Sequence, residues 1–98
     1  MYVRILRGQP KPGQVAEVVK RWETHAAPRM RTMPGFRNAY CSGDVATNVT
    51  VTVSLWDELP DTEAMGQLMK EVSAQMQDIT TAPPIVETYE VLAQVQAG

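Results

Sequence analysis

The stretch from Val49 to Pro60, VTVTVSLWDELP, constrains the fold of this chain more than any other. Its branched apolar residues occupy every second position, and alternation with period two is typical of a β-strand. The positions between them lack the charged residues of an ordinary solvent face. They carry small hydroxyl residues and then one large aromatic residue, in the order Thr50, Thr52, Ser54, Trp56. We therefore expect a strand with one apolar face and a second face suited to form one wall of a pocket.

The rest of the chain supplies three more strands and two helices. Alternating residues predict strands at 2–7, 36–42 and 85–92. Apolar residues spaced three and four apart predict one helix that begins near residue 13 and another over residues 61–79. Pro28 is expected to kink or end the first helix, because it lacks the N–H of the helical hydrogen bond and clashes with the preceding turn.

The order strand–helix–strand–strand–helix–strand is that of the split βαβ, or ferredoxin-like, arrangement. The 98 residues are expected to form one α+β domain, 1–98, with a four-stranded antiparallel sheet. Right-handed crossovers place both helices on one face of that sheet. The opposite face is apolar and has no cover from its own chain. Because an uncovered apolar face is an association site, we expect a homodimer in which two sheets pack face to face.

Composition excludes several classes of function. The net charge of −2 provides no basic field for nucleic acid. The single cysteine, Cys41, cannot form an internal disulfide or a thiolate metal site, and one histidine among scattered carboxylates has no metal-ligand spacing. We find no signal peptide and no apolar run near the ~20 residues of a membrane span. We therefore expect a cytoplasmic protein without metal, membrane or nucleic-acid partners.

A set of motifs resembles the antibiotic biosynthesis monooxygenase domain, one of the dimeric α+β barrel families. The similarity spans almost the whole chain. The residues that carry it are Lys11-Pro12-Gly13 after the first strand, Glu17 and Trp22 in the first helix, Met33-Pro34-Gly35-Phe36 before the second strand, Trp56 at the end of the third strand, and Glu63-Ala64 at the start of the second helix.

The resemblance implies a small dimer with a pocket between sheet and helices. Some members oxidise aromatic polyketides or quinols with dioxygen and no metal or organic cofactor, and others open the porphyrin ring of haem. In one oxidase type an asparagine four residues before the tryptophan positions the substrate, and that place is held here by Thr52. The haem-degrading members use an asparagine, the tryptophan and a histidine. Arg7, Trp56 and Gly66 stand at those places, so the resemblance does not favour haem degradation.

Two residues are candidates for a direct role in catalysis. The indole of Trp56 can stack on a planar substrate and donate one hydrogen bond, although a core tryptophan that plugs the strand end would look the same. His25 is the only histidine of the chain, and histidine is the residue type most often used as a general acid or base. It can act as a general base on a phenol or hydroquinone, and the alternative is an ordinary histidine at the edge of a helix.

Other residues are candidates for substrate binding. Tyr40 and Tyr89 can bond to a substrate carbonyl or oxyanion, but tyrosines also pack well in sheets. Met65 and Met69 lie on one helical face and can form an adaptable wall against a flat apolar ligand, or simply fill the core. Three strand arginines can hold an anionic group or remain solvated on the surface: Arg4, Arg7, Arg37.

These observations lead to two hypotheses. The first is a cofactor-independent monooxygenase or oxidase that acts on an aromatic, phenolic or quinol small molecule, with Thr52 and Trp56 on the pocket side of the third strand. The second is a dimer of the same fold that binds a small aromatic or apolar ligand without reacting with it. The second is motivated by the threonine at position 52 and by the absence of a clear acid–base pair.

Overall fold

The computed structural model describes all residues from Met1 to Gly98. One sheet is formed by β1 (Tyr2–Gly8), β2 (Phe36–Asp44), β3 (Val49–Trp56) and β4 (Ile85–Glu90). The first helical segment comprises α1 (Val15–Arg21), a π turn η1 (Trp22–Ala26) and α2 (Ala27–Met30), and the second helix is α3 (Thr62–Met76). The predicted elements are therefore all present, in the predicted order.

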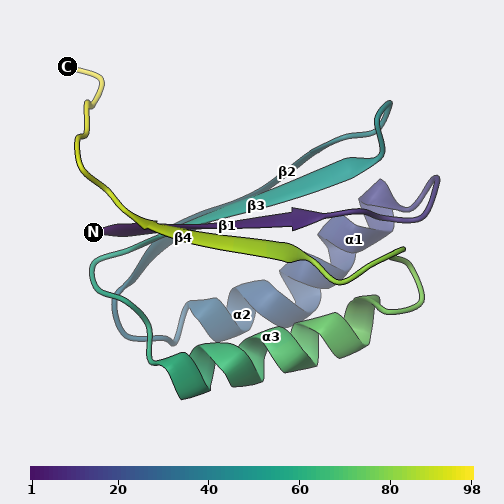
Figure 1. Cartoon of the computed structure of the whole chain (residues 1–98), viewed down its shortest axis with the longest axis horizontal. Coiled ribbons are helices and arrows are strands. Elements are labelled where there is room, and N and C mark those ends of the chain that lie inside the picture. Colours follow the sequence, from purple (N-terminus) through teal and green to yellow (C-terminus); the bar gives the residue numbers. More distant parts are fainter.

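The four strands are antiparallel and lie in the order β2-β3-β1-β4. All the helices lie on one face of the sheet, and the two chain termini lie near the same end of it (Figure 1). The α+β ferredoxin-like arrangement predicted from the sequence is thus confirmed. No helix is both long enough and apolar enough to cross a bilayer.

The helical segment continues through Pro28 to Met30, although the sequence allowed that it would end there. The π turn before the proline explains the continuation. The N–H of Ala27 bonds to the carbonyl of Trp22 five residues earlier, and Pro28 then falls in the first turn of α2. A proline is tolerated at that position, because the N–H it lacks would have no partner within the helix.

The second helix begins at a side-chain cap and is tied to the first at its far end. A carboxylate oxygen of Asp61 accepts a hydrogen bond from the N–H of Ala64 at 3.0 Å, which satisfies one of the free donors of the first turn. Just beyond the other end, Arg21 of α1 donates to both carboxylate oxygens of Asp78 at 2.6 and 3.2 Å. The two helices are therefore held together where α3 ends.

The hydroxyl face of β3 packs beneath the helices. Thr50 and Ser54 are each 5% exposed and Trp56 is 1% exposed. Around the indole lies the main core cluster of the helices and sheet, formed by Ala26, Met30, Trp56, Met65, Leu68. The opposite orientation of β3, in which its valine face would lie beneath the helices, is not observed.

The second strand contains a β-bulge that the sequence pattern did not predict. Simple alternation placed Phe36 on the same face as Asn38 and Tyr40. In the structure Phe36 pairs with Trp56 and Asn38 with Leu55, so the register shifts between them. An extra residue in one strand turns the side chain before it to the other face, and Phe36 packs edge-on against the Trp56 ring with centroids 5.2 Å apart.

The opposite face of the sheet carries no helix, as Figure 1 shows. We call this the open face. The register places on it the β3 residues Val49, Val51, Val53 and Leu55 with Val3 and Ile5 of β1. Toward the sheet edges it carries Tyr40, Ile85 and Tyr89, which are 60%, 65% and 53% exposed.

Candidate functional site

A cavity of about 320 Å³ lies between the sheet and the C-terminal half of α3. We call it the main cavity. The strands supply its floor, α3 and the first helical segment its upper walls, and the segment after α3 closes one end. Its walls include Leu6, Val18, Trp22, Thr52, Met69, Val72, Ser73, Met76 and the turn Thr80–Pro84. This volume is at the lower end of the range for small-molecule sites, which is roughly 300–1,000 Å³.

Two further cavities continue this space along β1. An inner cavity of about 40 Å³ shares Leu6, Trp22, Thr52 and Met69 with the main cavity. An outer cavity of about 420 Å³ lies at the start of α3 and shares three residues with the inner one, namely Arg4, Trp56, Met65. The inner cavity thus borders both of the others, and residues of α3 and of the sheet line all three. We call the three cavities together the groove.

The position of Trp56 in the groove depends on a turn formed by the Met33-Pro34-Gly35-Phe36 motif. Gly35 has φ +81°, a conformation that favours glycine. Its carbonyl accepts a hydrogen bond from the N–H of Asp57 at 2.7 Å, and a Cβ on Gly35 would lie 3.0 Å from the Glu58 side chain. The turn thereby fastens the start of β2 against the end of β3.

The indole N–H of Trp56 is already used within the protein. It donates to the hydroxyl of Ser54 at 2.9 Å, two residues earlier on the same face of the strand. Trp56 therefore borders the inner and outer cavities as a side chain that is 1% exposed, and its only hydrogen-bond donor is satisfied. The hydrogen bond to a substrate expected from the sequence would require this internal bond to break.

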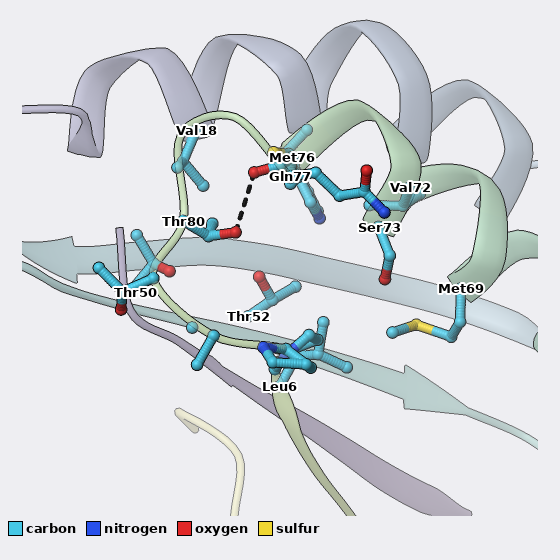
Figure 2. Close-up of a pocket in the computed structure, with 16 residues that line it drawn as sticks. Leu6, Val18, Thr50, Thr52, Met69, Val72, Ser73, Met76, Gln77 and Thr80 are labelled. Carbon is cyan, nitrogen blue, oxygen red and sulfur yellow. Dashed lines mark hydrogen bonds between the residues drawn. The ribbon is translucent and has the colours of Figure 1, made fainter. Parts of the chain in front are cut away.

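The main cavity has a neutral lining. None of its sixteen lining residues is acidic or basic, and its polar groups are hydroxyls, one amide, the Trp22 indole and backbone. Figure 2 shows the Thr52 hydroxyl on the sheet and the Ser73 hydroxyl on α3 in the space between the two elements. The Thr52 hydroxyl also lies 3.9 Å from the sulfur of Cys41, and burial raises the pKa of that thiol. The thiol is thus kept in its neutral form.

One charged residue of the groove, Arg4, is partly buried, whereas Glu90 at the outer cavity is exposed. The register sets Arg4 between Ser54 of β3 and Thr88 of β4, and it lines both the inner and the outer cavities. Burial lowers the pKa of its guanidinium, because desolvation disfavours the charged form. No acidic side chain forms an ion pair with it.

The groove is lined by four residues expected from the sequence to bind a substrate, Thr52, Trp56, Met65 and Met69, and is bordered as well by the candidates Arg4 and Tyr89. Thr52 and Met69 line both the main and the inner cavities, and Trp56 and Met65 line the inner and the outer ones. Met65 and Trp56 also belong to the buried core cluster. The pocket interpretation and the core interpretation thus apply to the same two side chains.

The other candidates do not point into the main cavity. His25 is exposed and lines none of the three cavities, because it sits one residue before the buried Ala26 and therefore faces away from the core. Tyr40 pairs with Val53 on the open face. Tyr89 borders the outer cavity from the edge strand, but its hydroxyl donates to Glu87 at 2.7 Å, and this bond raises the pKa of the phenol.

Sequence reasoning missed part of the lining. Leu6 and Trp22 were assigned only to a strand and a helical stripe, and Ser73 was not considered. A signal for Leu6 did exist, because the antiparallel register sets it opposite Thr52. Ser73 follows Met69 by four residues and so shares its helical face. No group of three or more His, Cys, Asp or Glu side chains comes together in a way that could hold a metal ion.

Comparison with known proteins places this fold among oxygenases and proteins of unknown function. No family model matches the chain, and no curated protein matches it in sequence. Among solved structures, a monooxygenase of Streptomyces coelicolor in complex with nanaomycin D has a TM-score of 0.73 at 14% identity, over 99% of this chain and 92% of that one. SnoaB, a cofactor-independent oxygenase of Streptomyces nogalater, has a TM-score of 0.71 at 15% identity, over 98% of this chain and 97% of that one.

A protein of unknown function from Nitrosomonas europaea is similar to the same degree, with a TM-score of 0.72 at 19% identity over 99% of this chain and 95% of that one. At such identities the likeness concerns the fold alone. It agrees with the resemblance seen in the sequence motifs, and the chain therefore has the fold of the antibiotic biosynthesis monooxygenases.

Proposed function

We propose that this protein is a cofactor-independent oxidase or monooxygenase that acts on a flat aromatic, phenolic or quinol molecule. The observation that carries the proposal is the main cavity, whose lining combines the Trp22 ring, the Met69 thioether and the Thr52 hydroxyl without any charged side chain. Such walls suit an electron-rich ring, and the hydroxyl can bond to a substrate oxygen.

The fold supports this choice of chemistry. One neighbour is a monooxygenase in complex with nanaomycin D, and another is a cofactor-independent oxygenase. For a substrate of the anthrone type, the ring methylene loses two hydrogens and gains one oxygen atom of O₂, and the other oxygen leaves as water. For a hydroquinone, the two hydroxyls lose two electrons and two protons to O₂, and quinone and hydrogen peroxide form. The substrate supplies all the electrons in both cases.

Oxygen uptake tests the proposal. Purified protein is incubated with a panel of anthrones and hydroquinones, and the initial rate is compared with the rate without protein. Thr52→Val removes the hydroxyl at nearly constant volume, and Ser42→Ala removes a hydroxyl on the open face as the matched control. We expect uptake above background, lowered about 10-fold by Thr52→Val and unchanged by Ser42→Ala. Background rates with every member of the panel would refute the proposal.

The neutral lining also favours a second candidate, a binding protein of the same fold. No acid–base pair lines the main cavity, and His25 lies outside the groove. Such a protein would bind the same anthrones and hydroquinones without forming product. Calorimetric titration under nitrogen and then under oxygen separates the two, because only an oxidase converts the bound ligand when oxygen is admitted.

We further propose that two copies pack through their open faces. Valine, leucine and isoleucine side chains dominate the centre of that face, and tyrosines border it, a composition typical of association surfaces. Sedimentation equilibrium should give twice the 10.9 kDa of one chain. A mass of one chain at all concentrations would contradict a dimer. The cytoplasmic location stays a prediction, which fractionation of expressing cells would check.

A further inference from the structure

Arg4 differs from every other basic residue of the chain. Four arginines form ion pairs with carboxylates, in the pairs Arg7–Glu87, Arg21–Asp78, Arg29–Glu71, Arg37–Asp57. The remaining basic side chains are exposed to solvent, namely Lys11, Lys20, Arg31 and Lys70. Arg4 alone is partly buried and has no acidic partner. Its charge is neither solvated fully nor compensated.

The surroundings of Arg4 are built from neutral groups. Ser54 and Thr88 flank it on the neighbouring strands, and Trp56 and Met65 line the same cavities. The only acidic residue on these walls is Glu90, which is exposed and not within ion-pair distance of Arg4. A partly desolvated, unpaired guanidinium costs free energy in the empty protein. An anion that enters the groove would relieve that cost.

The position of Arg4 relative to the main cavity defines the shape of such an anion. Leu6 lines the main cavity and lies two residues further along the same face of β1, which is roughly 7 Å away. The small inner cavity is bordered by both residues. A ring system in the main cavity can therefore carry an acidic substituent that reaches the guanidinium.

We propose that Arg4 binds the carboxylate of a flat aromatic acid whose ring system occupies the adjacent main cavity. A guanidinium suits this role, because its planar fork donates two parallel hydrogen bonds to a carboxylate. The inference rests on the proposed function for the location of the ring, and it narrows the substrate class from aromatic compounds in general to aromatic carboxylates.

Equilibrium binding of a matched pair of probes tests this inference. The probes are 3-hydroxy-2-naphthoate and the neutral 3-hydroxy-2-naphthamide, followed by their fluorescence at low ionic strength. We expect the acid to bind about tenfold more tightly than the amide, the range of a charge-assisted bidentate pair. Arg4→Met should remove the preference by weakening the acid alone, and Arg4→Lys should keep part of it. Arg31→Met, at an exposed and unpaired arginine, should change neither affinity.

Thermal unfolding separates binding from a structural role. If Arg4 serves binding, Arg4→Met should unfold at the same temperature as the wild type or a higher one, because the variant loses an uncompensated charge. Three results would overturn the inference. They are equal affinities of the wild type for the two probes, a loss of affinity in Arg4→Met that is equal for the acid and the amide, and no binding of either probe. Binding needs no turnover, so an acid preference without oxygen uptake would refute only the oxidase. Oxygen uptake without an acid preference would refute only the role of Arg4.

Discussion

The two faces of β3 have opposite environments, and the less apolar face is the buried one. Thr50, Ser54 and Trp56 lie beneath the helices, whereas the valine face has no cover from its own chain. Burial of the Ser54 hydroxyl is tolerated because it accepts the indole hydrogen bond, and no buried side-chain polar atom lacks a partner. The small hydroxyl residues also leave room above them, where the groove lies. The comparison shows that the face with the smaller side chains holds the cavity, whereas the valine face carries no helix.

Truncation of Trp56 should give the largest difference in stability between the two faces of β3. Trp56→Ala empties the centre of the core cluster and should lower the free energy of unfolding by about 3–5 kcal/mol. Its neighbour Leu55→Ala, on the open face, should cost about 1 kcal/mol in the monomer, because that side chain is only half-buried. Urea denaturation at low protein concentration measures both. Equal losses would show that the two faces are equally packed within one chain.

A charge on the open face should act on association and not on the fold of one chain. Val53→Asp would bury an unpaired carboxylate between two sheets and should weaken dimerisation at least about 100-fold. Ala16→Asp, on the exposed side of α1, is the control and should leave association unchanged. Sedimentation equilibrium over a concentration series provides the dissociation constants. An unchanged constant in Val53→Asp would remove the open face as the interface.

Loss of a hydroxyl should matter on the helix-covered face and not on the open one. Ser54→Ala leaves the buried indole N–H of Trp56 without an acceptor and should cost about 1–3 kcal/mol. Ser42→Ala removes the hydroxyl that donates to the Val51 carbonyl at 2.7 Å, but this group is exposed and its loss should cost less than about 0.5 kcal/mol. Chemical denaturation of the two variants gives the difference directly, and a reversed order would contradict the comparison.

Acid should affect the open face through Glu87. Hydrogen bonds from Tyr89 and Arg7 lower the pKa of this carboxyl below its ordinary value of 4.5. A carboxyl with a depressed folded-state pKa stabilises the protein above its unfolded-state pKa, and the contribution disappears as the pH falls through the folded-state value. The stability gap between wild type and Glu87→Gln should therefore be constant above pH 4.5 and shrink below it. Denaturation curves from pH 3 to pH 7 check this, and a gap independent of pH would contradict it.

The fold could be predicted because each element has its own periodicity. The alternation of β3 and the apolar stripe of α3 identify both elements independently of the rest of the chain. Phe36 was placed on the wrong face because a bulge adds one residue without changing the local composition. The sequence predicted that Pro28 would kink or end the first helix, but it did not identify the π turn through which the segment continues, since a π turn has no clear sequence signature.

Of the groove, the sequence predicted mainly the wall that β3 supplies, because the alternation of that strand identified its pocket side. Thr52 and Trp56 were placed on the pocket side by the alternation and the family pattern together. The role proposed for Arg4 could not be inferred from the sequence. The three strand arginines look alike in the sequence, and their ion pairs are known only from the structure. Tyr40 and Tyr89 illustrate the converse. Their residue type suits a substrate, but Tyr40 lies on the open face, and Tyr89 only borders the outer cavity while its hydroxyl bonds to Glu87.

The π turn has a consequence for the phase of the first helical segment. Trp22, Ala26 and Met30 succeed one another at intervals of four residues, and in an α-helix such a series drifts by about 40° at each step. A wider turn between the first two opposes that drift, and all three side chains pack into or against the same core cluster. Conversion of this turn to an ordinary α-helix with all its residues kept would rotate everything after it by about 100°, whereas deletion of one residue from Trp22–Ala26 would restore an ordinary helix and leave the later residues in phase. The segment thus contains what amounts to a one-residue insertion, which the fold uses to keep its angular alignment.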